Sequence, residues 1–397
     1  MSATSPARRL HMLLRPTATS ASNFFLNKSF NGQFTAVVGL SSSHKVDQQY
    51  VSWTSTRRNY STKRDDVVDV KEVIIPVPWG HIAARHWNGS DPTRKPILCL
   101  HGWKDNAATF DTLFPLLVPE LPQYQFLAID LPGHGKSSHF PPGMIYSVQD
   151  MWVAIRRILK HFDWKRISII SHSMGSQISF SYSGTHPEVV EKLVTIDALS
   201  PLVLSREETI SMIPKLTSDI LKFEHKLATG TRPSYSYDDI VAKLVKTHVG
   251  GLDAASCKKL MTRGVEEHPP GSGMYQFTHD IRVHYMPVTG ISSRQVSFIA
   301  RNFKSDILNI KATEGVNYTR PYIKTRIEDW LANGEDGKPK GNLVRFVDVE
   351  GNHHLHLINP VSVLPYIVRF LDHEKHHVQN HLHQKKLRAA HDKNFKN

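Results

Sequence analysis

The chain has 397 residues, of which 40% are hydrophobic, and it carries a formal net charge of +13 and only two cysteines. The hydrophobic residues are numerous enough for a large apolar core, and two cysteines are too few for a disulfide framework. The sequence also lacks the run of about 18 apolar residues that a membrane-spanning helix needs. Residues 1–64 hold +8 of the charge, and no basic stripe with interleaved aromatic residues follows, so nucleic acid is not an expected partner.

Residues 1–64 form a basic N-terminal segment that contains a single acid, Asp47. Within residues 7–15, leucines and arginines fall on different helical faces, namely Leu10, Leu13 and Leu14 against Arg8 and Arg15. An amphipathic basic helix without carboxylates is typical of a mitochondrial transit peptide, and Arg58 lies three residues before Ser61 as in matrix-protease sites. The sequence predicts a mitochondrial matrix location, with a disordered tail on a cytoplasmic protein as the alternative.

From residue 65 to residue 372 the sequence predicts one domain. A leading antiparallel hairpin is expected first, because the run 70–87 breaks at Pro76–Gly80. Six short apolar runs are predicted strands, at residues 96–100, 124–129, 167–170, 192–196, 307–312 and 343–349. Helical patterns separate them, as at residues 147–162 and 360–371. Strands that alternate with helices imply a mostly parallel sheet with helices on both faces.

The segment Ile167–Ser176 is the most informative part of the chain. An apolar, β-branched run stops at a small-residue turn with Ser173 at its apex, and an amphipathic stretch follows. A strand, a sharp turn and a helix in this order strain the backbone of the apical serine and expose its hydroxyl at the top of the sheet. A nearby histidine can then take the serine proton and make the oxygen a nucleophile.

Residues 200–290 interrupt the strand pattern and are predicted to form a helical cap over the mouth of the site. The predicted helices are Arg206–Ala228, Tyr237–Val249 and Leu252–Arg263. Apolar positions of the first helix favour a hydrophobic substrate, with packing onto the core as the alternative, and they are Met212, Ile213, Leu216, Ile220, Leu221 and Phe223. Asp280 and Arg282 are expected to form a structural ion pair.

Several spaced blocks together resemble a known family. They are Leu100–Phe110, Asp130–Ser138, Ser171–Ser176, Thr195–Pro201, Phe277–Arg282 and Gly351–Leu357. In their order over residues 70–372 they are similar to serine hydrolases of the α/β-hydrolase fold, and closest to the serine hydrolase-like proteins of animals, insects included. The departures are Ser171 and Ser176, where relatives more often carry glycine.

The resemblance implies a base after the last strand, where Gly351–His356 offers three histidines. The family's Gly-x-His spacing selects His353, with His354 as runner-up and His356 as a structural residue. No carboxylate or cysteine accompanies these histidines at ligand spacing, so no metal site is expected. The tail 373–397 contains six further histidines and is expected to be a solvated extension.

The orienting acid must lie between the serine and the histidine in this fold. Asp197 follows the predicted strand 192–196, and Glu314 follows the strand 307–312, which is the commoner place for the acid. The usual aspartate position there is occupied by Gly315, with Glu314 one residue early. Asp197 is therefore the predicted acid, and Glu314 is the alternative.

The oxyanion hole is expected from two backbone N–H groups. Met174 follows the nucleophile at a helix N-terminus, whose dipole favours negative charge, and Trp103 follows His101–Gly102. Because glycine has no side chain, the backbone at Gly102 can approach a carbonyl oxygen closely.

These features predict a cofactor-independent serine hydrolase, namely a carboxylic ester hydrolase that acts through an acyl-enzyme on a small or medium hydrophobic ester. A serine at the apex argues against epoxide hydrolase and haloalkane dehalogenase chemistry, which places an aspartate there. Carbon–carbon bond hydrolysis by the same residues is one alternative. The other is a catalytically silent binding protein on the same scaffold.

Overall fold

The computed structural model describes residues 69–230, 232–288, 291–317, 321–334 and 336–372. These residues all belong to one compact unit, residues 57–397. The expected transit peptide and the expected solvated tail lie outside the described residues. Within them, every helix is too short or too polar to cross a membrane.

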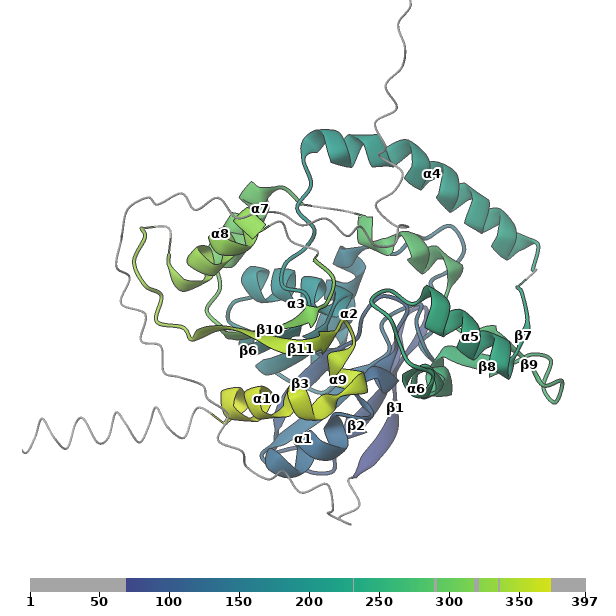
Figure 1. Ribbon diagram of the computed structural model, residues 1–397, viewed down its shortest axis with the longest axis horizontal. Helices are drawn as coiled ribbons and strands as arrows, with labels where there is room; N and C mark the ends of the chain where they lie inside the picture. Colours follow the sequence, from purple (N-terminus) through teal and green to yellow (C-terminus); the bar gives the residue numbers. More distant parts are fainter. Residues whose placement is uncertain (1–68, 231, 289–290, 318–320, 335, 373–397) are drawn as a thin grey trace, which may run out of the picture. The chain divides into compact units, whose positions relative to one another are not determined.

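An eight-stranded sheet forms the centre of the unit, in the order β1-β2-β4-β3-β5-β6-β10-β11 (Figure 1). Its strands are β1 Val70–Val77, β2 Gly80–Trp87, β3 Lys95–Leu100, β4 Tyr124–Ile129, β5 Ile167–His172, β6 Val190–Ile196, β10 Asp306–Glu314 and β11 Val344–Asn352. Strands β1 and β2 pair as the predicted antiparallel hairpin, and β2 also runs antiparallel to β4. The remaining neighbours in the sheet, in the order β4-β3-β5-β6-β10-β11, are all parallel. All six predicted strands are therefore confirmed.

Helices cover both faces of this sheet, as the alternation of patterns predicts. One apolar core packs α2 (Val148–His161), α3 (Met174–Thr185), α7 (Ser293–Arg301) and α8 (Pro321–Ala332) against the sheet. The other contains η1 (Ala107–Phe110), α1 (Phe114–Glu120), α10 (Leu364–Leu371) and the first residue of α9 (Leu355–Ile358). Parallel strands buried on both faces read as continuous apolar runs, which is why the sequence reveals them.

The predicted helix 147–162 is confirmed with its caps, since Ser147 is the N-cap and Phe162 the C-cap of α2. The predicted helix 360–371 is instead divided into η3 (Pro360–Ser362) and α10. Pro365 stands in the first turn of α10 and has no N–H to donate to an earlier turn, so the helix must begin again there.

The segment 200–290 contains three of the predicted helices and a small sheet that the sequence analysis did not expect. The elements are α4 Arg206–Ala228, β7 Tyr235–Ser236, α5 Tyr237–Thr247, α6 Ala254–Gly264, β8 Val265–Glu267, β9 Met274–Phe277 and η2 Ile281–Val288. The three strands pair antiparallel in the order β7-β9-β8. The three predicted helices are confirmed and the small sheet is an addition to them, which the sequence could not reveal because strands of two to four residues are too short to show a periodicity of two.

Helix α4 runs along the outside of the unit (Figure 1). Of its residues only Phe223 is buried, while Ile213 is 49% and Leu221 66% exposed. These two apolar side chains thus face neither a substrate cavity nor the core. Amphipathic spacing reports a helix, but it cannot report how closely that helix approaches the rest of the protein.

Buried ion pairs attach this segment to the core. The guanidinium of Arg263 in α6 is fully buried and donates to both carboxylate oxygens of Asp130, at 2.8 and 3.2 Å, and also to Glu72 of β1. Asp280 and Arg282 form the predicted pair, with Nη2 2.7 Å from Oδ2. Because a buried charge without its partner is costly, these pairs hold the segment in one place over the strand ends.

Candidate active site

Ser173 stands at the junction between β5 and α3. Its backbone has φ 51° and ψ −117°, a conformation that side-chain-bearing residues rarely adopt, and it is the N-cap of α3. The helix starts very close to β3, since a Cβ on Gly175 would lie 2.4 Å from the carbonyl oxygen of Leu100. The strained strand–turn–helix predicted from the sequence is therefore present.

The two departures from the family's glycine pattern are accommodated by hydrogen bonds. The hydroxyl of Ser171 lies 2.8 Å from the Ser179 hydroxyl and 3.1 Å from the Val194 carbonyl oxygen. The hydroxyl of Ser176 donates to the Ser171 carbonyl oxygen at 2.9 Å. Both serines are fully buried, and a buried hydroxyl costs little once it is hydrogen-bonded.

The fold brings Ser173, His353 and Asp197 into one hydrogen-bonded chain. His353 lies just after β11, with Nε2 2.9 Å from the Ser173 hydroxyl oxygen and Nδ1 2.6 Å from Asp197 Oδ2. Ser173 is 4% and His353 2% exposed, so the chain is shielded from bulk water. His354, the runner-up for the base, points instead toward Asp105, with Nε2 3.5 Å from Oδ2.

Asp197 follows β6 and also has a positive φ, 47°. Its carboxylate accepts hydrogen bonds from the backbone N–H groups of Ala312 and Val316, at 3.1 and 3.0 Å, and from the Lys311 ammonium. A Cβ on Gly315 would lie only 2.2 Å from either carboxylate oxygen. Asp197 thus reaches over the end of β10 and fills the space where the fold usually places its acid.

Glu314 ends β10 and its side chain is exposed, which separates it from the buried His353. The absence of a side chain at Gly315 therefore leaves the space that the carboxylate of Asp197 occupies. The sequence analysis noted the mismatch at this position, and the structure gives its physical meaning.

Burial and hydrogen bonding shift the pKa values of Asp197 and His353 in opposite directions. Burial raises the pKa of Asp197, but the hydrogen bonds from His353 and Lys311 outweigh it and hold the pKa below its ordinary value. Burial lowers the pKa of His353, and the hydrogen bond to Asp197 opposes that only in part. At neutral pH the carboxylate is therefore charged and the imidazole neutral, as a proton acceptor requires.

Of the two expected oxyanion donors, Met174 directly follows Ser173, and Trp103 lies in the loop after β3. Met174 is the first residue of α3, where helix N–H groups have no partner within the helix. Trp103 follows Gly102, whose missing side chain is needed because a Cβ would lie 2.9 Å from His172 Nδ1. Within the described ranges, neither N–H donates a hydrogen bond.

A buried aspartate behind the base was missed by the sequence analysis. Asp105 is 1% exposed and faces three imidazoles, with Oδ1 2.8 Å from His248 Nε2 and Oδ2 3.5 Å from both His172 Nδ1 and His354 Nε2. Burial raises the pKa of Asp105, but these imidazoles hold it well below the ordinary range. His172 also bonds the carbonyl of His353 at 2.9 Å, so Asp105 supports the loop that carries the base.

Asp105, His248 and His354 also bear on the expectation that there is no metal site. That expectation rested on the absence of a carboxylate near the histidines along the chain. In the fold, the ligand atoms of these three residues lie within 4.8 Å of one another, as do those of His172, His353 and His354. The spacing argument could not reveal Asp105, since the cluster joins residues that are far apart in sequence, and the expectation of no metal site stays a prediction.

His356, expected to be structural, is fully buried and its Nε2 lies 2.9 Å from the Thr109 hydroxyl. It thereby ties α9 to η1 and does not face Ser173.

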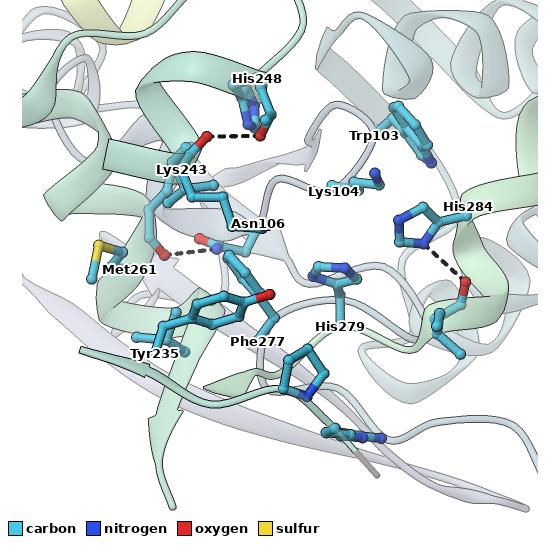
Figure 2. Close-up of a pocket in the computed structure, with 18 of the residues that line it drawn as sticks. Trp103, Lys104, Asn106, Tyr235, Lys243, His248, Met261, Phe277, His279 and His284 are labelled. Atoms are coloured by element: carbon cyan, nitrogen blue, oxygen red, sulfur yellow. Dashed lines mark hydrogen bonds between the residues drawn. The ribbon is translucent and has the colours of Figure 1, made fainter. Parts of the chain in front are cut away.

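A cavity of about 260 Å³ lies between the loop after β3 and the segment 200–290 (Figure 2). Its core side includes Trp103, Lys104 and Asn106, and its apolar wall includes Leu260, Met261 and Phe277. The walls are tied together by two hydrogen bonds, from Trp103 Nε1 to the Val283 carbonyl and from Asn106 to the Leu260 carbonyl.

The cavity adjoins the Ser173 chain without including it. Trp103 is the expected oxyanion donor and lines the cavity, and so do His248 and Val249. The next residue, Gly250, packs against the base, since a Cβ there would lie 2.1 Å from His353 Cβ. The cavity therefore approaches the Ser173 site from the side of Trp103 and Gly250.

Comparison with known proteins agrees with this architecture. Residues 95–218 match the family described as alpha/beta hydrolase fold. A probable serine hydrolase of Drosophila melanogaster is 36% identical over 76% of this chain and 87% of its own length, and a serine hydrolase-like protein of Danio rerio is 33% identical over 76% and 88%. A hypothetical protein of Pseudomonas aeruginosa has a similar structure, with a TM-score of 0.63 and 25% identity over 76% of this chain and 98% of its own.

The relatives are matched over most of their own length, and the segment that matches the family model contains strands β3 to β6 and the Ser173 elbow. The resemblance drawn from the six sequence blocks is thus confirmed, as is the predicted fold class. The chain belongs to the serine hydrolase-like family of the α/β-hydrolase fold.

Proposed function

We propose that the protein is a carboxylic ester hydrolase in which Ser173 is the nucleophile, His353 the base and Asp197 the orienting acid. The observation that carries this proposal is the unbroken hydrogen-bond chain from Asp197 through His353 to the Ser173 hydroxyl. The carboxylate fixes the imidazole so that Nε2 faces the serine, and it stabilises the imidazolium that forms during the reaction.

In the first half of the reaction, the Ser173 oxygen attacks the ester carbonyl carbon while its proton passes to His353 Nε2. The carbon–oxygen bond to the alcohol then breaks, and the alcohol leaves with that proton. This forms an acyl-enzyme on Ser173. In the second half, water attacks the acyl carbon, gives a proton to His353, and the carboxylic acid is released as Ser173 regains its proton.

The backbone N–H groups of Trp103 and Met174 would hold the oxyanion in both halves. Each such donor lowers the barrier by about 3 kcal/mol when it is aimed at the developing charge. The adjoining cavity, close to the lower limit of ligand pockets at roughly 300 Å³, favours a small or medium substrate.

Two measurements test the proposal. Hydrolysis of p-nitrophenyl esters of rising chain length reports turnover and the size of the pocket together. Labelling by a fluorophosphonate probe reports an activated serine without requiring the right substrate. A protein that neither turns over esters nor takes the probe would be a silent binding protein, whereas labelling without ester turnover would favour the carbon–carbon hydrolase alternative.

The pH dependence follows from the lowered pKa of His353. The neutral imidazole accepts the serine proton, so kcat/KM should reach its maximum above this pKa and fall as the pH drops through it. Since burial lowers the pKa of His353, the midpoint should lie below about 6.5, the ordinary value. We expect a single acid limb in a pH profile of a p-nitrophenyl ester, with full activity at pH 7. A midpoint above pH 7 would contradict the assignment of the base.

We also propose that residues 1–64 direct the protein to the mitochondrial matrix. They hold +8 of the net charge and precede the first described strand, so their removal should leave ester hydrolysis intact and prevent import. Imported protein should begin near Ser61, which N-terminal sequencing checks. Replacing Arg8 and Arg15 by glutamate should leave the protein in the cytosol. Unchanged location of that double variant would favour the cytoplasmic alternative.

A further inference from the structure

The cavity beside Ser173 is lined by basic side chains and by no acid. Four lining residues are lysine or arginine and three are histidine, namely Lys104, Lys226, Arg232, Lys243, His248, His279 and His284. No Asp or Glu lines it. His248 is hydrogen-bonded to Asp105, but none of the four lysine and arginine side chains forms an ion pair with a carboxylate in the part of the chain described. The cavity therefore has an unbalanced positive charge.

Lys104 lies deepest among these cations. It is half-buried, whereas Lys226, Arg232 and Lys243 are exposed. Its backbone has φ 62°, which is unfavourable for a residue with a side chain, and its ammonium lies 4.0 Å from the centre of the Trp103 ring. Burial lowers the pKa of Lys104 to about 8, so at neutral pH it is still mostly charged. A desolvated ammonium without an acidic partner is unfavourable until an anion supplies one.

One of the two histidines beside Lys104 can also donate a hydrogen bond to an anion. His279 and His284 stand on the same side of the cavity, with ring centres 5.6 Å apart, and the His284 ring is 6.0 Å from that of Trp103 (Figure 2). Burial and, to a smaller extent, the charge of Lys104 lower the pKa of His284 to about 4. The neutral His279 imidazole can still donate one N–H, whereas the Nδ1–H of His284 already donates to the Ile281 carbonyl oxygen at 2.9 Å. The exposed Lys226 and Lys243 would attract an anion toward the same opening.

We propose that the substrate is an ester that carries an anionic group, a carboxylate or a phosphate, which this cavity binds through the Lys104 ammonium. The inference rests on ester hydrolysis at Ser173, because the cavity adjoins that residue through Trp103 and Gly250. The apolar wall of Leu260, Met261 and Phe277 packs against the chain that joins the anion to the ester. The substrate is thus amphipathic, with one charged end, in place of the wholly hydrophobic ester expected from the sequence.

Two sets of matched esters test this. In the acyl series, p-nitrophenyl pentanoate, mono-p-nitrophenyl glutarate and p-nitrophenyl 4-phosphonobutanoate differ only in their last group: methyl, carboxylate or phosphonate. In the alcohol series, butyl acetate, 4-acetoxybutanoate and 3-acetoxypropylphosphonate differ in the same way, and released acid is titrated. We expect kcat/KM at least about tenfold higher for an anionic ester than for its methyl partner in one series. Whichever anionic ester has the higher kcat/KM shows whether the cavity prefers a carboxylate or a phosphate-like group.

Variants assign the effect to the cavity. Lys104→Met should lower the ratio of anionic to methyl-ended kcat/KM about tenfold, mainly through KM, and Lys104→Arg should restore most of it. Lys243→Met, at the exposed rim, should lower the ratio a few-fold at low salt only. Lys246→Met is the matched control, because Lys246 is exposed on the same helix α5 and does not line the cavity. It should leave the ratio unchanged.

Equal or better turnover of the methyl-ended ester in both series would overturn the inference and leave ester hydrolysis standing. So would a Lys104→Met variant that loses anionic and methyl-ended activity in the same proportion, since Lys104 would then only support the loop. If Lys104→Met does not fold, an unchanged ratio in Lys243→Met at low salt is the overturning result. Loss of the proposed function looks different, because then no ester of either series is hydrolysed.

Discussion

Ser173→Ala should abolish ester turnover and fluorophosphonate labelling. The variant removes the oxygen that is acylated in the proposed mechanism, and loss of a nucleophile of this kind costs on the order of 10⁴-fold or more in kcat. Among the described residues, the Ser173 hydroxyl is hydrogen-bonded only to His353 Nε2, so its removal should leave the fold intact. Steady-state kinetics with p-nitrophenyl acetate and thermal unfolding of the same sample measure both effects.

Ser176→Ala is the control for this experiment. Ser176 lies three residues further along α3 and is fully buried, but its hydroxyl donates only to the Ser171 carbonyl. Its removal should cost about 1 kcal/mol of stability and leave labelling of Ser173 intact. Substantial turnover in Ser173→Ala would show that another residue is the nucleophile.

Asp197→Asn should damage the enzyme far more than Glu314→Gln. An amide at residue 197 no longer holds the Nδ1–H of His353 or stabilises its positive charge, and the corresponding change in a serine hydrolase lowers kcat about 10⁴-fold. Glu314 is exposed at the end of β10 and does not contact the base, so its amide variant should act like the parent protein. Parallel kcat measurements on the two purified variants decide between the acids.

Gly315→Ala provides a second route to the same question. Its new methyl group would lie 2.2 Å from the Asp197 carboxylate and must displace it, so kcat should fall although no ionisable group is changed. The opposite order of damage, with Glu314→Gln the more severe, would move the acid to Glu314. Activity near that of the parent in both Asp197→Asn and Glu314→Gln would remove each from the proposed triad.

Much of the fold could be predicted from local patterns. The strands β3, β5 and β6 are buried on both sides over most of their length, so apolar residues dominate their sequences and make them easy to recognise. Helix α2 has a serine cap and one apolar face, which are also local signals. The small-residue turn around Ser173 is equally local, because the close approach of α3 to β3 restricts the residue types there.

The sequence by itself therefore determined the parallel sheet, the elbow with Ser173 at its apex, and the position of His353 after the last strand. Each depends on residues that are neighbours in the chain, where periodicity and turn chemistry act. The preference for Asp197 over Glu314 needed one longer-range clue, the glycine at residue 315, whose empty space only the fold could show to be filled by the aspartate.

The tertiary structure alone decided which distant residues share one environment. Asp105 and His248 are 143 residues apart, yet they are hydrogen-bonded behind the base. The positive cavity likewise combines Lys104 from the loop after β3 with His284 of η2 and with one lysine each of α4 and α5, Lys226 and Lys243. No local sequence pattern predicts that these residues come together, since electrostatic and packing energies depend on distance in space and not on separation along the chain. Composition records the basic residues, but only the folded chain leaves their charges unbalanced around one cavity.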